Sequence, residues 1–534
     1  MENVSSNWEM PERYNFARDC VAVHAAKRGS ARALLWLDAS GNTADISFAE
    51  MNDRAGRAAA VLQSVGVQRG DTVLILLGRE LEWWELMLGC LRLGAIASPG
   101  TIQLMPKDIL YRRNVANARC IVTSDAVAGR VDEALSSDDS IARLHIGGQR
   151  PGWIDYGHAS SAAEPLLEIA DTAVDEPVLC YFTSGTTGQP KMAMHGAGYT
   201  LAHRITSEHW LQLQPDDLVW NLSDTGWAKA AYSSLFAPWW AGSGIVSYNA
   251  PGFDPVAVLD LLGTLPVTTL CAPPTAYRMF VRSDLRTLKA PALRRCVSAG
   301  EPLNPEVIDL WKAATGLDIN DGYGQTETVM ICCNRPGAQR QGAMGKPTPG
   351  FDLAVLDQDG NRASSGEEGD VGLWVGDERR APGLFLGYRD DPERTNNVFR
   401  NGWYLTGDRA IIDADGFFWF VGRSDDVILT SGYRIGPFEV ESALFEHPAV
   451  AESAVVASPD PTRGEVVKAF VILAAGFPAS EDLVKELQDH VKQTTAPYKY
   501  PRKIEFVTSL PKTISGKIRR KELRDKEWNE AARQ

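Results

Sequence analysis

Residues 183–191 read TSGTTGQPK, and this loop holds the kinds of group that bind a polyphosphate. It contains two glycines, four hydroxyl residues and Lys191, which offer backbone N–H groups, hydroxyl donors and a cation. It is not a Walker A loop, because the GxxxxGK(S/T) pattern is absent and Pro190 precedes the lysine. Gly, Ser and Thr also cluster in plain polar turns, so this loop alone leaves both interpretations open.

Four further polar segments follow this loop along the chain. They read DGYGQTE at 321–327, YLTGD at 404–408, GRSDDVILTSGYRIGPFEVE at 422–441 and PKTISGK at 511–517. Together with the loop they are similar to the signature motifs of the adenylate-forming superfamily, which includes acyl-CoA synthetases, adenylation domains and luciferases. Five motifs in order, over nearly the whole chain, make this resemblance far more specific than one motif.

The resemblance is strongest to medium-chain acyl-CoA synthetases. It rests on NLSDTGWAKA at 221–230, APWWAG at 237–242, SGYRIGPFEVE at 431–441 and SPDPTRGEVVKAFVIL at 458–473. Thr430 stands where that subfamily often has serine, which is a conservative departure. The resemblance implies an AMP-forming acid–thiol ligase that uses ATP, Mg²⁺ and coenzyme A.

Such an enzyme activates a carboxylate, which is a poor electrophile, in two steps. The carboxylate attacks the α-phosphorus of ATP, pyrophosphate leaves, and the acyl-AMP then gives its acyl group to CoA. Because two anions meet in the first step, the site needs cations and N–H donors aimed at the phosphoryl oxygens. A general base is not required for that step.

Three residues carry the catalytic roles that the resemblance implies. Lys517 inserts between the carboxylate and the α-phosphate, Thr326 donates to the α-phosphate, and Glu327 binds Mg²⁺. The alternatives are a surface lysine in a basic tail and a Gln-Thr-Glu run that caps a helix. The ordered set of motifs favours the catalytic interpretation.

The nucleotide site is expected to combine the first loop with three later segments. Asp408 accepts both ribose hydroxyls, as one carboxylate can, and Arg423 binds the ribose or a phosphate. Tyr323 either stacks on the adenine or is a core tyrosine. The other expected ATP and AMP contacts are Thr183, Ser184, Gly185, Thr186, Thr187, Gly188, Lys191, Gly300, Glu301, Pro302, Asp321 and Gly322.

The second step needs a different arrangement, because Lys517 occupies space that the thiol must cross. The resemblance implies rotation of a small domain about a hinge at Asp425. Residues Ser431, Gly432, Tyr433 and Arg434 are then expected to bind CoA, with the glycine letting pantetheine pass close to the backbone. Lys468 and Arg463 are weaker candidates for CoA phosphates, and solvated charges are the favoured interpretation of both.

Acyl specificity is predicted from the position of Gly324. Acetate-specific relatives carry tryptophan there, so glycine predicts an open pocket for medium-chain or aromatic acids. Trp227 and Val329 are expected to line this pocket, although core packing explains Trp227 equally well. No basic residue is assigned to a second carboxylate, so dicarboxylic acids are not expected.

These residues need a scaffold, and the apolar pattern predicts an α/β fold. Short apolar runs such as Thr72–Leu77 and Val178–Thr183 alternate with helical patterns such as Glu80–Leu93. This alternation predicts βαβ units and largely parallel sheets. After about residue 350, short strands separated by DQDGNR and DADG turns predict a small β-barrel-like subdomain.

The last part of the chain is predicted to be a compact, mobile α+β domain. Ser480 is expected to cap a helix that presents Leu483, Leu487 and Val491 on one face. The predicted domains are 1–424, with the β-rich subdomain at 350–424, and 425–534, which carries the catalytic lysine. The charged stretch Arg519–Gln534 is expected to be a solvated end.

Composition limits the partners and suggests a location. The net charge of −14 argues against broad binding to nucleic acid, and no apolar run is long enough to span a membrane. Eight cysteines without CxxC pairs indicate buried thiols in a reducing compartment. The chain does not begin with the basic segment and apolar run of a secretory signal peptide, so a cytoplasmic location is predicted. The oligomeric state stays open.

Two other functions compete with acyl-CoA synthesis. A stand-alone adenylating enzyme could load a carrier protein in place of CoA, but the motif around 432–437 favours CoA. A non-catalytic binding protein with this fold would be expected to lack Lys517, Glu327 or Asp408, and all three are present.

Overall fold

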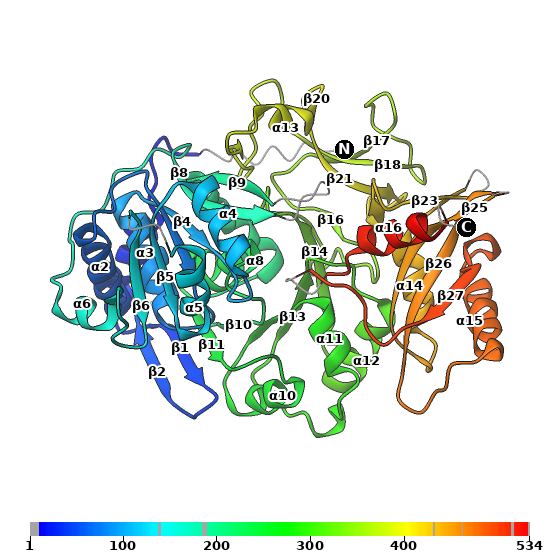
Figure 1. Ribbon diagram of the computed structural model, residues 1–534, viewed down its shortest axis with the longest axis horizontal. Coiled ribbons are helices and arrows are strands. Elements are labelled where there is room, and N and C mark those ends of the chain that lie inside the picture. The colour runs from blue at the N-terminus through cyan, green and yellow to red at the C-terminus, as the bar shows by residue number, and fades with distance from the viewer. Residues whose placement is uncertain are drawn as a thin grey trace.

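The structure is a computed structural model that describes residues 10–136, 140–183, 190–430, 433–461, 463–513 and 517–531. It contains four sheets, which follow one another from the blue N-terminal part to the orange C-terminal part in Figure 1.

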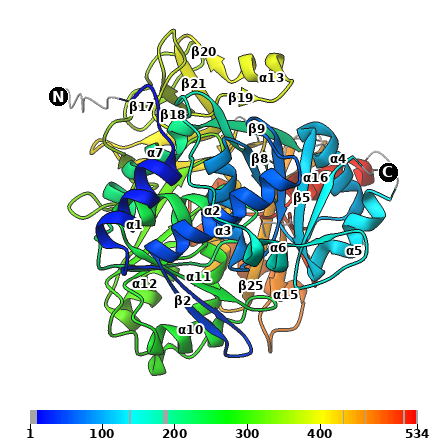
Figure 2. The same ribbon diagram turned by 90° about the vertical axis from the view of Figure 1, so that its left-hand side faces the viewer.

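The first sheet has eight strands in the order β19-β9-β8-β4-β3-β5-β6-β7, and from β8 to β7 they are parallel. Alternate residues of β3 face opposite sides, as the pleat requires, and all five are buried. Val73 and Ile75 pack toward α2 and α3, whereas Leu74 and Leu76 pack toward α4 and α5. Figure 2 shows α2 and α3 side by side on the face of the sheet to which Val73 and Ile75 belong.

The elements of this layer are β3 (Thr72–Leu76), β4 (Ile96–Pro99), β5 (Ala118–Ser124), β6 (Ala142–Ile146), β7 (Ile154–Asp155), β8 (Pro177–Thr183), β9 (Lys191–Gly196), β19 (Gly387–Tyr388), α2 (Phe48–Ser64), α3 (Glu82–Leu93), α4 (Pro106–Ala116), α5 (Asp125–Ala134) and α6 (Tyr156–Ala162).

The second sheet has nine strands in the order β16-β15-β14-β13-β12-β10-β11-β1-β2, with β14 to β1 parallel. Helices α10, α11 and α12 bury one face, where Trp220 and Leu270 lie. The other face packs against η2, η3 and α9 through Val219 and Cys271. Parallel strands place their carboxyl ends at one edge, where ligands of α/β folds bind.

The elements of this layer are β1 (Arg32–Asp38), β2 (Thr43–Ser47), β10 (Leu218–Asn221), β11 (Gly244–Asn249), β12 (Thr269–Cys271), β13 (Arg295–Ala299), β14 (Ile319–Gly324), β15 (Met330–Cys333), β16 (Lys346–Pro347), η1 (Ala17–Ala22), α1 (Val23–Arg28), α7 (Ala197–Ile205), η2 (Thr206–Leu211), α8 (Ala228–Ala231), η3 (Tyr232–Phe236), α9 (Ala237–Ala241), α10 (Pro255–Thr264), α11 (Pro274–Phe280), η4 (Leu285–Thr287) and α12 (Pro305–Thr315).

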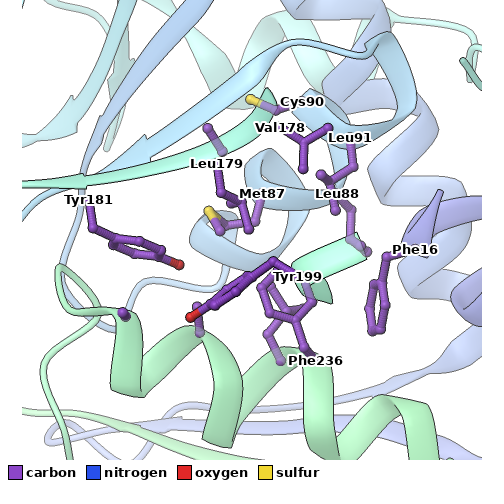
Figure 3. Packing of buried hydrophobic residues seen from close by; sticks show 14 of the residues in the cluster. Phe16, Met87, Leu88, Cys90, Leu91, Val178, Leu179, Tyr181, Tyr199 and Phe236 are labelled. Carbon is purple, nitrogen blue, oxygen red and sulfur yellow. The ribbon is translucent and has the colours of Figure 1, made fainter. Parts of the chain in front are cut away.

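A large apolar core joins these two layers. In Figure 3, Met87, Leu88 and Leu91 of α3 pack beside Val178 and Leu179 of β8. Phe16 of the N-terminal segment meets Phe236 of η3 edge to face, with ring centroids 5.0 Å apart. The two sheets are therefore held as one body by shared packing.

The third sheet is antiparallel and follows the order β17-β18-β21-β20, with β22 paired to β21. It corresponds to the β-rich region expected after residue 350 and lies at the top of Figure 1. Its elements are β17 (Leu353–Leu356), β18 (Glu368–Trp374), α13 (Pro392–Asn397), β20 (Phe399–Arg400), β21 (Trp403–Ile412) and β22 (Phe418–Arg423).

The fourth sheet, with order β24-β23-β26-β25 and β27 beside β26, forms the C-terminal α+β unit. The hydroxyl of Ser480 accepts a hydrogen bond from the N–H of Leu483 at 3.1 Å, and Leu483, Leu487 and Val491 are buried, as predicted. The elements are β23 (Ile428–Thr430), β24 (Tyr433–Ile435), α14 (Pro437–Phe445), β25 (Val450–Asp460), β26 (Gly464–Leu473), α15 (Glu481–Thr494), η5 (Pro497–Lys499), β27 (Lys503–Phe506) and α16 (Arg520–Ala531).

The prediction of a solvated stretch from Arg519 was wrong for its described part. Helix α16 packs on β25, and Leu523 and Glu527 are each 6% exposed. Lys468, expected to be solvated, donates to Glu505 at 2.7 Å and to Glu527 at 2.6 Å. Four charged residues of α16 thus form ion pairs inside the unit, namely Arg520, Arg524, Lys526 and Glu527. No helix among the described residues is long and apolar enough to cross a membrane.

Arg520 of α16 should be essential for this packing. Its guanidinium donates to both carboxylate oxygens of buried Glu441, with the shortest contact at 2.6 Å. Arg520→Met should destabilise the C-terminal unit by about 3 kcal/mol, because it leaves a buried charge unpaired. Hydrogen exchange of β25 amides during urea denaturation measures the effect.

The double variant Glu441→Gln, Arg520→Met removes both charges and should cost less than the single variant. Arg286→Met, in an exposed ion pair with Asp284, serves as a control with no measurable change. Equal exchange in Arg520→Met and the parent would contradict the assigned role.

Candidate active site

A cleft of about 1480 Å³ opens where the carboxyl ends of β13 and β14 face the third sheet and the C-terminal unit. Its lining includes residues of all five sequence motifs, and those from the phosphate loop are Thr183, Pro190 and Lys191. Thr183, Lys191, Thr326, Glu327, Asp408, Arg423 and Lys517 all border it.

The carboxylate of Asp408 is held by donors from three segments. One of its oxygens accepts hydrogen bonds from the hydroxyl of Tyr323 at 2.5 Å and the amide of Gln325 at 2.8 Å. The other accepts from Arg423 at 3.1 Å, because β21 and β22 pair these two residues directly. Asp408 is 4% exposed, so this network fixes a buried anion at the cleft wall.

Gln325 was missed by the sequence analysis, although it lies within the DGYGQTE motif. Its amide also donates to the carbonyl of Thr406 at 2.8 Å, and its oxygen accepts from the hydroxyl of Tyr404 at 3.0 Å. Tyr323 uses its hydroxyl for Asp408 while it borders the cleft. Stacking of Tyr323 on adenine stays a prediction.

Glu327 and Lys191 are linked through Tyr388, a residue the sequence analysis did not single out. The Tyr388 hydroxyl donates to Glu327 Oε1 at 2.8 Å, and Lys191 Nζ lies 4.9 Å from the Tyr388 ring centroid. Pairing of β19 with β9 places Tyr388 opposite Ala193 and so beside the lysine. Burial lowers the pKa of Lys191, and the nearby carboxylate of Glu327 opposes that shift.

The expected adenine shelf lies at the carboxyl ends of β13 and β14. Gly300 has φ +101°, which favours glycine, and nothing lies within 4 Å of where its Cβ would be. Glu301 pairs with Arg278 at 3.0 Å, and Pro302 borders the same wall. Burial raises the pKa of Asp321 to about 8, while the N–H of Gly322 donates to it at 2.9 Å.

Lys517 belongs to the C-terminal unit and borders the cleft with an exposed side chain. Its backbone carbonyl accepts from the N–H of Thr513 at 2.7 Å, and its N–H donates to the Thr513 hydroxyl at 3.1 Å. Both bonds join Lys517 to Thr513, on the N-terminal side of the lysine. Residues 514–516, between them, lie outside the described residues.

The three residues expected in the acyl pocket lie in different surroundings. Trp227 borders the cleft, whereas Val329 is 1% exposed and belongs to the large apolar core. A Cβ on Gly324 would lie 2.4 Å from the carbonyl oxygen of Val329, so glycine is required by the close approach of two chain segments. Its effect on pocket size stays a prediction.

Several other predicted site residues are placed only in part. Ser184, Gly185, Thr186, Thr187, Gly188, Ser431 and Gly432 lie outside the described residues. Tyr433 stacks on Tyr498 with ring centroids 4.2 Å apart, and Arg434 lies 4.0 Å from Glu368. Asp425 follows β22, and its carbonyl accepts from Arg524 of α16 at 2.7 Å. Their roles in CoA binding and rotation stay predictions.

Family models match the two parts of the chain that build this cleft. The AMP-binding enzyme model matches residues 21–389, and the AMP-binding enzyme C-terminal domain model matches residues 439–517. The chain belongs to the AMP-binding enzyme family. The resemblance drawn from the five motifs is therefore confirmed.

This AMP-binding enzyme is similar to curated proteins along nearly its whole length. It is 48% identical to mouse "Acyl-coenzyme A synthetase ACSM3, mitochondrial", over 97% of this chain and 92% of the relative. It is 49% identical to the mouse ACSM4 protein, over 98% and 92% respectively. These full-length matches confirm the predicted enzyme class.

Solved structures share the same architecture. An anthranilate CoA ligase, AuaEII, in complex with anthranoyl-AMP has a TM-score of 0.90 at 32% identity, covering 98% of this chain and 99% of that one. A benzoate CoA ligase from Burkholderia xenovorans has a TM-score of 0.85 at 28% identity, covering 96% and 100%. The predicted fold class is confirmed.

The predicted cytoplasmic location of this AMP-binding enzyme is wrong by the same comparison, because the similar ACSM3 and ACSM4 proteins are named as mitochondrial. The prediction relied on the lack of a basic–apolar secretory signal and on the absence of disulfide-type cysteine patterns. Free thiols indicate a reducing compartment but do not distinguish one such compartment from another.

Asp321 should make the stability of this AMP-binding enzyme depend on pH. Between about pH 4 and pH 8 the folded state keeps the Asp321 proton and the unfolded state loses it. The stability that the Asp321 carboxyl contributes is thus fully present below the pKa that this carboxyl has in the unfolded chain. It is lost as the pH rises through the folded-state pKa of about 8.

Asp321→Asn should therefore gain stability relative to the parent as pH rises across this range, with a slope of at most about 1.4 kcal/mol per pH unit. Urea denaturation of both proteins at several pH values measures the difference. Parallel stability curves between pH 4 and pH 8 would show that the carboxyl is ionised in the folded protein.

Proposed function

We propose that this enzyme activates a medium-chain or aromatic carboxylic acid as its acyl-AMP and transfers the acyl group to coenzyme A. The observation that carries the proposal is the position of Lys517, in the same cleft as the fixed carboxylate of Asp408 and the Glu327–Tyr388–Lys191 chain. A cation from the C-terminal unit thereby reaches a site whose other parts come from the first, second and third sheets.

In the proposed adenylation step, this chain supplies charge and orientation in place of a base. Asp408, held by Tyr323, Gln325 and Arg423, accepts the ribose hydroxyls and so fixes the nucleotide. Lys517 and Thr326 stabilise the negative charge that builds up on the α-phosphate as the carboxylate oxygen attacks. Lys191 attracts the departing pyrophosphate.

The site residues also fit one magnesium ion. Glu327 Oε1 accepts from Tyr388, and no described residue donates to Oε2. Within the described residues no group of three or more His, Cys, Asp or Glu could hold a metal by itself. Mg²⁺ is commonly bound by one or two carboxylates together with substrate phosphates, so Glu327 would hold it. When bound, it supplies charge neutralisation between phosphate oxygens.

Thioester formation requires Lys517 to leave the cleft, and we place the pivot at Asp425. The last strand of the third sheet ends at Arg423, and β23 begins at Ile428, so a short segment joins the proposed domains 1–424 and 425–534. Rotation would bring the region around Tyr433 and Arg434 toward the acyl-AMP. The exposed Tyr433–Tyr498 stack supports contact with a ligand on this face.

The chain-length preference can be tested with a panel of acids from acetate to dodecanoate, together with benzoates. Medium-chain or aromatic acids should exceed acetate in kcat/KM by at least about 10-fold, because each buried methylene adds roughly 0.8 kcal/mol. CoA-dependent AMP release and thioester formation are measured. A best rate with acetate would contradict the assigned class, and AMP release without thioester would favour a carrier-protein acceptor.

Lys517→Ala should separate the two half-reactions. Acyl-AMP formation, followed by pyrophosphate exchange, should fall by about 100-fold or more, because one transition-state cation is lost. Thioester formation from preformed acyl-AMP should be largely unchanged.

Lys512→Ala is a matched control from the same motif, because Lys512 pairs with Glu452 at 2.8 Å. It should retain both half-reactions. If Lys517→Ala slowed the two half-reactions equally, the division of roles would be wrong.

A further inference from the structure

Lys229, in α8, is a deeply placed lysine that the proposed mechanism does not use. Its Nζ donates to the carbonyl oxygen of Ala299 at 2.6 Å. The side chain is half-buried, and its ammonium group reaches the carboxyl end of β13. The sequence alone led to no basic residue being assigned to a second carboxylate, and Lys229 was not singled out.

The neighbours of Lys229 place it beside the expected acyl site. Trp227, two residues earlier, borders the cleft, as does Gly300, which follows Ala299. Ala299 pairs with Gly322 across β13 and β14, two residues before Gly324. The ammonium group therefore lies at the carboxyl ends of these strands, next to the wall that Trp227 forms.

The charges around Lys229 leave it poorly neutralised. The titratable groups that act on it are Cys271, Asp321, Glu301 and Lys517. Glu301 is paired with Arg278, and burial raises the pKa of Asp321 to about 8 against the lowering effect of Lys229. Cys271 is a buried thiol whose pKa is raised, and Lys517 is itself a cation. Among the described residues, only the Ala299 carbonyl accepts from an ammonium that has three N–H donors.

A second donor of the same segment also lacks an acceptor. The indole N–H of Trp227 is buried, and no described residue accepts its hydrogen bond. A buried donor without an acceptor is costly, and the cost is larger for an ammonium group. Two donors on one short segment are best satisfied by an oxygen that arrives with the ligand.

We propose that Lys229 is a specificity-determining residue whose ammonium group binds an oxygen carried on the acyl part of the substrate. The preferred acids would then carry a keto oxygen, a hydroxyl group or a second carboxylate in addition to the carboxylate that is activated. The apolar walls bind the carbon skeleton, and Lys229 selects the substituent. This inference rests on the proposed acyl-CoA synthetase function and names the substrate class of the same site.

The test uses matched acids of one chain length: hexanoate, 5-hydroxyhexanoate, 5-oxohexanoate and adipate, with 3- and 4-substituted benzoates as the aromatic series. CoA-dependent AMP release gives kcat/KM for each. For the parent enzyme, kcat/KM should be about 10-fold or more higher for at least one oxygen-bearing acid than for the plain acid, meaning the acid of the same skeleton without the extra oxygen. The reason is that a site built to bind a polar group rejects analogues that lack it. A higher kcat/KM for every plain acid would overturn the proposal.

Lys229→Met, which keeps length and removes charge, should reverse this ranking. The loss for the oxygen-bearing acids should appear in KM for the acid, while KM for ATP and the rate with plain acids stay close to the parent values. An equal loss for all acids would overturn the proposal, because it would mean that Lys229 positions β13 or contacts the reacting carboxylate.

Lys229→Gln, which keeps a donor, should recover part of the preference for keto acids but not for adipate. If Lys229→Met fails to fold, the ranking of acids by the parent enzyme still decides the question. Failure of the parent to activate any acid would instead contradict the proposed function itself.

Discussion

The site depends on fixing one carboxylate before any ligand arrives. Asp408 receives hydrogen bonds from Tyr323 on β14, Gln325 in the following turn and Arg423 on β22. These donors belong to two different sheets, so the network joins the second sheet to the third at the cleft. In the proposed nucleotide site, a ribose hydroxyl would then meet an acceptor whose position has already been set by the fold.

The placement of two lysines bears on how a polyphosphate and a carboxylate could share one cleft. Lys191 enters from the first sheet, and Lys517 enters from the C-terminal unit. Each cation comes from a different layer, so neither needs to be held beside the other before ligands bind. In the proposed mechanism, the repulsion between the two anionic substrates would be offset by these lysines, which converge from separate parts of the fold.

Much of this arrangement could be predicted from the sequence, because the strands and motifs are local patterns. The buried strand Thr72–Leu76 and the Ser480-capped helix follow directly from apolar spacing and capping residues. Tyr388 could not be found this way, since its role comes from pairing between β19 and β9, far apart in the chain. Gln325 could have been proposed as a site residue because it lies inside a motif. Its hydrogen-bond partners could not have been predicted, because they lie on β21.

Two other outcomes show where local reasoning fails. The charged residues of α16 looked solvated, yet Arg520 and Glu527 are paired with groups from other elements. The role of Gly324 in pocket size stays a prediction, and local reasoning did not find the further backbone constraint that comes from the close approach of Val329. In both cases a residue's environment was decided by segments that its own sequence window does not contain.

All eight cysteines of the chain are reduced and buried, and burial raises the pKa of thiols such as Cys120 and Cys296 to about 12. A maleimide dye added to the folded protein should therefore find no native target. Fluorophores could be attached to single cysteines introduced on the outer surfaces of α2 and α15, with the native thiols left in place. Energy transfer between such a pair would follow the orientation of the C-terminal unit in solution throughout a catalytic cycle.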